Sequence, residues 1–381
     1  MDFSYSEEQL EVRALARQIL GDQTGNERQQ QIDAQEIRFD EKLWQDLADA
    51  GLLGVALDSE RGGMGFNFET LALLLEEVGR TVAAVPVIPA LVTAALPLQR
   101  FGSEAQKHAC LPGLANGKHL ITAALIEPGN EDPARPYTGA TAAGAGWVLS
   151  GSKHCVPYAQ QAEQCLITAQ AEDELLVFLL PLSSPGLTLK EQASTAGEPQ
   201  YQLDLESVAL GESVLIARGE QALELVQWMQ QLTRAAIAAM ATGLCDAMLR
   251  MTAEYTSQRE QFGVPVATFQ AVGHRAADCY IDIECLRLVS QEAVSLLSLG
   301  LDAEQATTIA KIWTGDVCHR VSQASQHLHG GTGVDRDYPL FRYCLMARQL
   351  ELSVGSSARL LEQLGTDIAV SFTSSGLETI D

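Results

Sequence analysis

Basic side chains are scarce in this sequence of 381 residues: 25 lysines and arginines stand against 49 aspartates and glutamates, a formal net charge of −24. Such an excess of negative charge repels nucleic acid and anionic membrane surfaces, so we expect neither as a partner. An anionic cofactor or substrate would need a locally basic pocket.

Long apolar runs are also missing, since no segment approaches the ~20 apolar residues that a membrane-spanning helix needs. The start, MDFSYSEEQL, carries acidic residues where a secretory signal has a basic region. The 46% content of hydrophobic residues is ordinary for a soluble protein with a sizeable core. We therefore expect a cytoplasmic protein of two or three domains.

Metal-binding motifs are lacking as well. The eight cysteines are scattered, with no C-x-x-C pair and no His/Cys cluster at ligand spacing, so we expect reduced core thiols. His327 and His329 lie two residues apart beside glycines. No carboxylate or third ligand accompanies them at a fixed spacing, and we expect no metal site.

Three patterns follow one another along the chain and predict three domains. Residues 1–118 show the period of α-helices. Residues 119–212 consist of short apolar or alternating runs bounded by Gly, Pro, Asn and Ser, which is typical of a small β-barrel or sandwich. Residues 213–381 return to the helical period in long segments that fit a four-helix bundle with a polar tail. The predicted fold class is α+β with several domains.

The first helix has a recognisable start. Ser6 followed by Gln9 predicts a capping box, in which each side chain bonds to the backbone of the other. The spacing of the apolar residues predicts one buried face, formed by Leu10, Ala14, Leu15 and Ile19.

The stretch YTSQREQFGVPVATFQ, residues 255–270, predicts a helix end near Arg259, a turn at Phe262-Gly263 and a new helix at Gln270. An arginine on the last turn of a helix presents a planar fork of donors that suits a pyrophosphate. Gly263 and Pro265 break the helix and fix the direction of that arginine. The stretch alone fits an exposed arginine beside a C-cap glycine equally well.

Together with this stretch, three other segments resemble the acyl-CoA dehydrogenase family over nearly the whole chain: DAGLLGVALDSERGGMGF, IEPG followed by WVLSGSKHCVP, and HLHGGTGVDRDYPLFRY. The resemblance implies FAD as cofactor and an acyl-CoA thioester as substrate. In the family's reaction, a carboxylate takes the α-proton while the β-hydrogen leaves as hydride to flavin N5. The resemblance also implies electron-transferring flavoprotein as the usual electron acceptor.

In this family, part of each FAD is held by a neighbouring subunit. The resemblance implies that Arg259, Phe262 and Gln270 contact the FAD of that neighbour. Gly330 and Gly331 would let backbone approach its adenosine part, although these glycines taken alone favour a helix-terminating turn.

Two further residues match positions of the family. His327 falls where many relatives carry glutamine, so it keeps the capacity to form hydrogen bonds. Arg234 matches an arginine that relatives place near the acyl-CoA, and a position on an ordinary helix face is the alternative.

The catalytic base of the family is not evident, and we leave the catalytic residues unassigned. Val354 stands where relatives carry the glutamate of a Tyr-Glu-Gly-Thr turn, and Thr233 stands at the other position known to carry the base. A valine cannot accept a proton. Glu351 lies about one helical turn before Val354 and is the remaining candidate.

The middle segment departs from the family too. Ile126 replaces a threonine, and Cys155-Val156-Pro157 replaces the Trp-Ile-Thr run that wraps the flavin ring. We therefore expect the base-lacking subunit of a hetero-oligomer with a paralogous partner, as in the bacterial branch of two unlike subunits that acts on steroid side-chain thioesters. The alternatives are a self-sufficient homotetramer with an atypical base and a flavin-free structural or binding paralogue.

Overall fold

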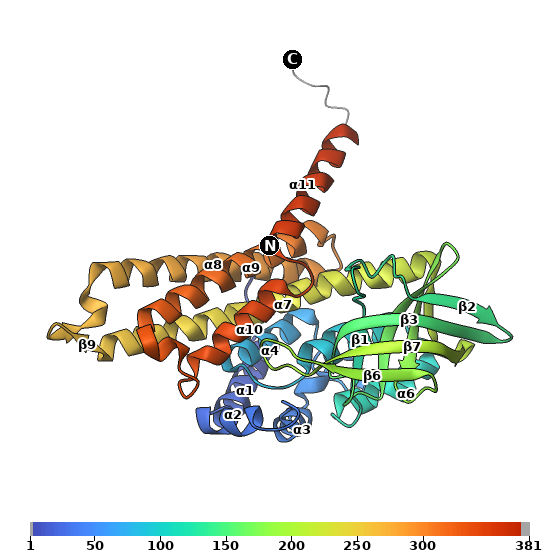
Figure 1. Cartoon of the computed structure of the whole chain (residues 1–381), viewed down its shortest axis with the longest axis horizontal. Coiled ribbons are helices and arrows are strands. Elements are labelled where there is room, and N and C mark those ends of the chain that lie inside the picture. Colours follow the sequence, from blue (N-terminus) through green and yellow to red (C-terminus); the bar gives the residue numbers. More distant parts are fainter. Residues whose placement is uncertain (1–2, 375–381) are drawn as a thin grey trace, which may run out of the picture.

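The computed structural model describes residues 3–374 and shows helical, strand-rich and helical parts in that order along the chain (Figure 1). A π-helical segment, Ile88–Ala95, lies within the first part. The α-helices of this part are α1 (Glu7–Gln23), α2 (Asn26–Asp33), α3 (Glu41–Asp49), α4 (Phe68–Thr81), α5 (Leu96–Phe101) and α6 (Glu104–Ala115).

Helix α1 begins where the sequence predicts, but it buries a different face from the predicted one. The Ser6 hydroxyl accepts from the Gln9 amide at 3.2 Å, and the Gln9 side chain accepts from the Ser6 amide at 2.9 Å, which confirms the capping box. The predicted buried face is wrong, since Leu10 and Leu15 are 46% and 39% exposed. The buried residues are instead Val12, Ala16 and Leu20.

Ion pairs with α4 account for this difference. Arg13 and Arg17 of α1 both bond to Glu77 of α4, at 3.0 and 2.8 Å. Burial alone would raise the pKa of Glu77, but its bonds to these arginines and the charge of Arg80 hold that pKa below its usual range. A buried carboxylate needs such partners, so they fix which side of α1 faces α4.

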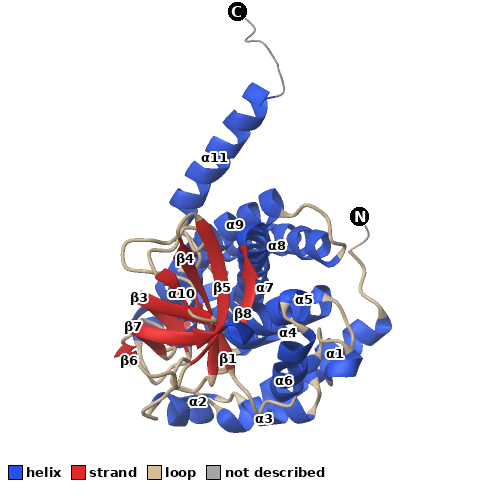
Figure 2. Ribbon diagram, turned by 90° about the vertical axis from the view of Figure 1, so that its right-hand side faces the viewer, coloured by secondary structure: helices blue, strands red, loops and turns tan. Residues whose placement is uncertain are grey.

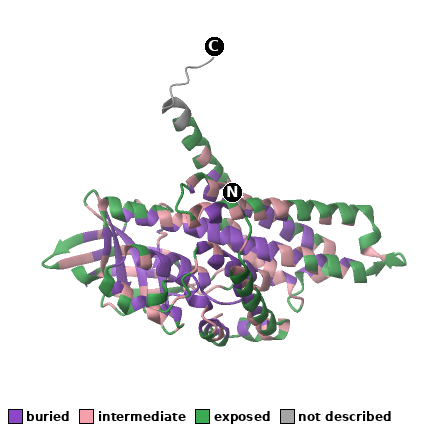
Figure 3. Ribbon diagram, turned by 180° about the vertical axis from the view of Figure 1, so that it is seen from behind, coloured by how far each residue is buried: buried purple, intermediate pink, exposed green. Residues whose placement is uncertain are grey.

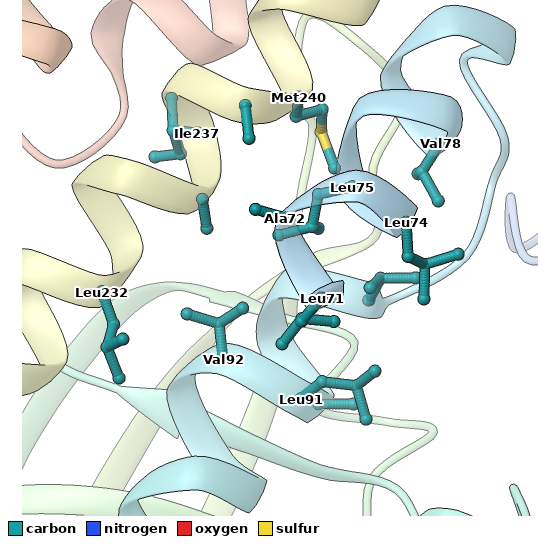
Figure 4. Close-up of a cluster of buried hydrophobic side chains, with 14 of the residues drawn as sticks. Leu71, Ala72, Leu74, Leu75, Val78, Leu91, Val92, Leu232, Ile237 and Met240 are labelled. Atoms are coloured by element: carbon teal, nitrogen blue, oxygen red, sulfur yellow. The ribbon is translucent and has the colours of Figure 1, made fainter. Parts of the chain in front are cut away.

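Helix α4 crosses the long helix α7 (Gly219–Gln258) at backbone contact. A Cβ atom on Gly79 would lie 1.9 Å from the Met240 carbonyl oxygen, and one on Gly243 would lie 1.8 Å from the Glu76 carbonyl oxygen. Apolar side chains of α4, α7 and the π-helical segment surround the crossing (Figure 4).

The middle part is one continuous sheet in the order β6-β7-β3-β2-β4-β5-β8, with β1 beside β4 (Figure 2). Its own core cluster, including Phe178 and Leu203, is separate from that of the helices. The sheet reaches Arg218, past the predicted boundary at residue 212, and the domain boundaries stay a prediction. The strands are β1 (Ile121–Ala124), β2 (Gly139–Ala143), β3 (Gly146–Pro157), β4 (Gln164–Ala171), β5 (Glu174–Pro181), β6 (Leu187–Gln192), β7 (Gln200–Gly211) and β8 (Leu215–Arg218).

The last part confirms the predicted helical bundle. Helix α9 packs against α7, α8 and α10, and α11 projects from the body of the molecule (Figures 1 and 2). A short hairpin of β9 (Glu260–Gln261) and β10 (Val264–Pro265) joins α7 to α8. The other helices are α8 (Gln270–Ser298), α9 (Glu304–His329), α10 (Leu340–Leu352) and α11 (Ser357–Ser374).

Helix α7 is the central element of the bundle. It is long and apolar enough to cross a membrane, but 83% of its most apolar window is buried inside the protein. The middle of the molecule is accordingly buried, while the outer faces of α8 and α11 are exposed (Figure 3). Helix α7 is therefore a core helix.

The α4–α7 crossing generates a stability prediction. We expect Gly79→Ala to lower the free energy of unfolding by roughly 1–3 kcal/mol, because its methyl group must push the two backbones apart. The matched control is Gly273→Ala on α8, where an added Cβ meets no atom within 4 Å. Urea unfolding of both variants checks the prediction, and equal midpoints would contradict it.

Candidate functional site

The hairpin after α7 places an arginine and an aromatic ring on the surface. Arg259 is the C-cap residue of α7, and its amide bonds to the Tyr255 carbonyl at 2.8 Å. Phe262 and Gly263 form the tip with φ angles of 56° and 80°, the pair of positive values found in type I′ hairpin turns. Phe262 is nevertheless 95% exposed. A bulky residue in this backbone region is unusual, and here the strain presents its ring to solvent.

Aromatic stacking joins this hairpin to the glycine turn after α9. The Tyr255 ring stacks on His329 with ring centroids 4.4 Å apart, and its hydroxyl lies 3.4 Å from the Thr332 hydroxyl. The buried His329 ring also lies 3.1 Å from the Tyr338 hydroxyl. The end of α7 and the turn Gly330–Val334 are thus held side by side.

Helix α8 begins at the same end of the bundle. Gln270 is its first residue, and Arg275, one turn later, lies 2.9 Å from Nδ1 of His327 on α9. The hairpin lies at the end of the molecule away from the sheet (Figure 1). The structure therefore brings together the elements of all the predicted cofactor-binding residues, namely Arg259, Phe262, Gln270, His327, Gly330 and Gly331.

The surface formed by these six residues is open to a ligand. All six residues are exposed, and the Arg259 guanidinium has no partner among the described residues. A Cβ atom on Gly330 or Gly331 would meet nothing within 4 Å, so a ligand can approach the backbone closely. Gly330 also ends α9 with a φ of 59°, so the glycines form a helix-terminating turn too.

Arg234 is not part of this surface. It lies 25 residues before Arg259 on the same helix, which corresponds to about 38 Å along the axis. It lines a cavity of about 1710 Å³ enclosed by α4, the π-helical segment, the sheet, α7 and α10. Its Nη1 donates to Thr308 at 2.9 Å and to Glu304 at 3.2 Å, while its buried Nε has no partner.

The position of the family's base lies on the wall of this cavity. Val354 has a φ of 56°, an outlier for a β-branched residue, and Gly355 follows with a φ of 99°. The fully buried Lys311 of α9 holds the turn, since its Nζ donates to the carbonyls of Glu351 and Gly355 at 2.9 and 3.0 Å. The turn is thus firmly built but carries no proton acceptor on its side chain.

Neither other candidate provides a base. The Glu351 carboxylate bonds to Arg348 and lies 3.6 Å from Nδ1 of His319 on α9, and it does not line the cavity. The Thr233 hydroxyl donates to the Met229 carbonyl of its own helix at 2.7 Å.

The sheet side of the cavity also lacks the expected hydroxyl groups. Ile126, Cys155 and Pro157 line it, and Cys155 takes a strained φ of 52° while its amide donates to Gln192 at 2.8 Å. These side chains offer a flavin ring neither the stacking surface of a tryptophan nor hydroxyl groups. At these three positions the cavity therefore departs from the flavin-wrapping pattern of the family.

A glutamate that the sequence did not single out faces the same cavity. Glu198 lies in the loop between β6 and β7, and its Oε2 accepts from Gln200 at 3.0 Å and from Gln349 of α10 at 2.6 Å. Burial raises the pKa of Glu198. A single acid in a loop rich in Gly, Pro and Ser carries no motif, so no signal in the sequence points to it.

The IEPG and GSK segments meet beneath the cavity. Glu127 accepts from Lys153 at 2.8 Å and from the Thr138 hydroxyl at 2.6 Å. Both charged side chains are almost completely buried, and burial lowers the pKa of Lys153 to about 8. This ion pair fixes strand β3 to the loop after β1, so these two segments of the resemblance have a structural role.

Comparison with known proteins identifies the class. Residues 6–118 match the acyl-CoA dehydrogenase N-terminal domain and residues 223–369 match the acyl-CoA dehydrogenase C-terminal domain, so the chain belongs to the acyl-CoA dehydrogenase family. Members of this family are FAD-dependent oxidoreductases. In residues 3–374, no group of three or more His, Cys, Asp or Glu side chains could hold a metal ion.

The chain is similar to particular members of this family. The chain is 33% identical to acyl-CoA dehydrogenase FadE27 of Mycobacterium tuberculosis, over 97% of this chain and 99% of that protein. The structure is similar to the ChsE4-ChsE5 complex of the same organism, with 32% identity, a TM-score of 0.92 and coverage of 97% and 99%. It is also similar to a variant of the Tcur3481-Tcur3483 steroid ACAD, with 40% identity, a TM-score of 0.90 and coverage of 96% and 99%.

The buried lysine under the Val354 turn generates a pH prediction. Burial lowers the pKa of Lys311 from 10.5 to about 8, so between these pH values the folded chain binds fewer protons than the unfolded chain. The free energy of unfolding contributed by Lys311 should therefore rise with pH in this window, by up to about 3 kcal/mol. Urea unfolding of wild type and Lys311→Met at about pH 7.5 and pH 10 measures it. An unchanged or oppositely shifted difference between the two proteins would contradict the assignment.

Proposed function

We propose that this chain is the base-lacking subunit of a hetero-oligomeric, FAD-dependent acyl-CoA dehydrogenase and completes the FAD site of a paralogous partner. One observation carries the proposal. The cofactor-contacting residues lie exposed at one end of the bundle, about 38 Å along α7 from this chain's own cavity. That cavity lacks both the base and the flavin-wrapping side chains.

In this arrangement FAD would supply the hydride acceptor for the β-hydrogen of the acyl-CoA, and the partner would supply the base for the α-proton. This chain's own residues bind and orient the cofactor. Arg259 offers its guanidinium to the diphosphate, and Phe262 and Gln270 flank it. Gly330 and Gly331 offer bare backbone to the adenosine part, and His327 contributes a ring nitrogen.

Exposed apolar residues support an oligomer. Tyr280, Ile281 and Leu288 on α8 are each 59% exposed, and Val334 beside the glycine turn is 66% exposed. Ile281 and Leu288 are seven residues apart and share one helix face. These two residues give α8 an exposed apolar stripe, while Phe262 and Val334 add apolar surface beside the proposed cofactor contacts, and a second subunit would cover both.

The relatives support the finer features of the proposal. The ChsE4-ChsE5 and Tcur3481-Tcur3483 structures contain two named chains, and the latter is a steroid ACAD. We therefore propose a heterotetramer in the cytoplasm that acts on a bulky, steroid-type acyl-CoA and passes electrons to electron-transferring flavoprotein. A self-sufficient homotetramer is less well supported, because Glu351 is tied to Arg348 and does not line the cavity. A flavin-free paralogue leaves the free guanidinium of Arg259 and the exposed ring of Phe262 without a role.

Replacing the proposed phosphate contact tests the proposal. In the complex with the paralogous partner, Arg259→Ala should lower retained FAD and dehydrogenase activity by about tenfold or more, since a charge-assisted contact is lost. The control is Arg250→Ala on the same helix, a 76% exposed side chain paired with Asp246, which should change neither quantity. FAD absorbance after gel filtration and dye reduction give the readouts. Unchanged FAD retention in Arg259→Ala would contradict the proposal.

Substitutions at and near the base position of this chain's cavity test whether catalysis takes place in this chain or in its partner. We expect Val354→Glu and Glu351→Gln each to leave the turnover of the complex within about twofold of wild type, since neither position touches the partner's reacting atoms. Steady-state dye reduction is the measurement. A Glu351→Gln variant that loses activity while its FAD content and unfolding midpoint stay normal would favour the self-sufficient enzyme.

A further inference from the structure

The cavity of this chain remains large although it lacks the groups that the family's chemistry needs. Its volume of about 1710 Å³ exceeds that of most small-molecule sites. Apolar side chains from all three parts of the chain form much of its wall, among them Val85, Ile88, Leu125, Ile237 and Met240. The cavity is therefore suited to a bulky apolar body.

The charges that line this cavity are mainly negative. Its arginines are Arg38, Arg135, Arg234, Arg348 and Arg359. All but Arg135 bond to a carboxylate of the chain itself, as in Arg38 to Asp33 at 2.7 Å and Arg359 to Glu131. By contrast, the carboxylates of Glu172 and Asp173 in the turn after β4, and that of Glu220, have no ion-pair partner among the described residues.

Glu174 of that turn is the exception, because it pairs with Arg218. A ligand that carries several phosphate groups, such as FAD or CoA, would meet a surplus of negative charge at this rim. Repulsion between like charges disfavours such a ligand, above all where water is partly excluded.

Two polar atoms of residues that line the cavity lack hydrogen-bond partners. Oε1 of Gln349 is buried without a hydrogen bond, although Nε2 of the same amide donates to Glu198. Arg234 is 5% exposed, and its buried Nε donor is also without a partner. Neither atom is reached by solvent in this structure, so the polar contact offered to a ligand must come from another group, such as Glu198.

Glu198 presents a hydrogen-bond acceptor to the cavity, and Gln349 holds it in place. A carboxylate has room for about four hydrogen bonds, and Oε2 of Glu198 accepts two within the chain. A ligand group that matches this carboxylate must donate a hydrogen bond and must not be an anion. A hydroxyl group meets both conditions.

We propose that this cavity is a binding site for an uncharged alcohol with a bulky apolar body, whose hydroxyl group donates its one proton to Glu198, while Gln349 holds that carboxylate in place. The site lies in the cavity, not on the cofactor-contacting surface at the far end of α7. It goes beyond the proposed function, because binding of the alcohol does not depend on the partner's flavin.

Two fluorescent probes that differ only in the polar group test the preference. Pyrenebutanol carries a hydroxyl group and pyrenebutyrate carries a carboxylate on the same apolar body. We expect the full-length chain to bind pyrenebutanol at least about tenfold more tightly, measured by fluorescence titration. Equal or tighter binding of pyrenebutyrate, or displacement of pyrenebutanol by an equimolar acyl-CoA, would overturn the proposal.

Variants locate the hydroxyl contact. Gln349→Leu and Glu198→Leu should each weaken pyrenebutanol binding by about tenfold. Glu198→Gln keeps an acceptor and removes the charge, so it should retain pyrenebutanol binding while pyrenebutyrate binding improves by about fivefold or more. The control, Glu191→Gln on the exposed part of β6, should change neither.

The Gln variant keeps the test decisive if Glu198→Leu fails to fold. A Glu198→Gln protein with wild-type preference between the two probes would overturn the assignment of Glu198. The outcome is independent of the Arg259→Ala experiment, since one measures FAD in the complex and the other measures probe binding by this chain.

Discussion

The backbone contact between α4 and α7 is the constraint on which the arrangement of the molecule depends. Gly79 and Gly243 let the two helices touch, and a row of ion pairs from Glu77 to Arg13, Arg17 and Arg80 closes the other side of α4. Helix α7 is thereby fixed as one rod of 40 residues. Because a helix rises 1.5 Å per residue, the rod sets the separation between Arg234 in the cavity and Arg259 at the hairpin.

That separation gives the chain two candidate sites with different chemistry. The hairpin region offers a free guanidinium, an exposed ring and bare glycine backbone, which together suit the phosphates and adenosine of a cofactor held by another subunit. The cavity offers apolar walls, neutralised arginines and acidic groups. The loss of a base at Val354 and of flavin-wrapping residues at Cys155 and Pro157 affects only the cavity, so the hairpin can keep its role.

Sequence reasoning succeeded where the determining interactions are local. The capping box of Ser6 and Gln9 and the turn at Phe262-Gly263 depend on residues within a few positions of each other, and both are present. It was wrong about the buried face of α1, because that face is set by carboxylates more than sixty residues away. The six residues that the resemblance assigns to a cofactor lie exposed at one end of the bundle, and their role stays a prediction. The sequence did not single out Glu198.

Glu198 shows why part of the candidate site could not be predicted from the sequence. Its proposed role depends on the partly buried hydrogen bond from Gln349, which lies 151 residues away in the chain. The strand β8 and the pairing of Lys153 with Glu127 likewise depend on the folded sheet. Such contacts between distant segments have no periodic or spacing signal in a single sequence.

The central claim is that this subunit completes a flavin site that belongs to its partner. The most direct test is the ratio of FAD to polypeptide in the purified, unmodified complex, obtained from the flavin absorbance after denaturation and from the amount of each chain. The account predicts one FAD for each pair of unlike chains, and no FAD on this chain when it is purified alone. One FAD for every chain would contradict it.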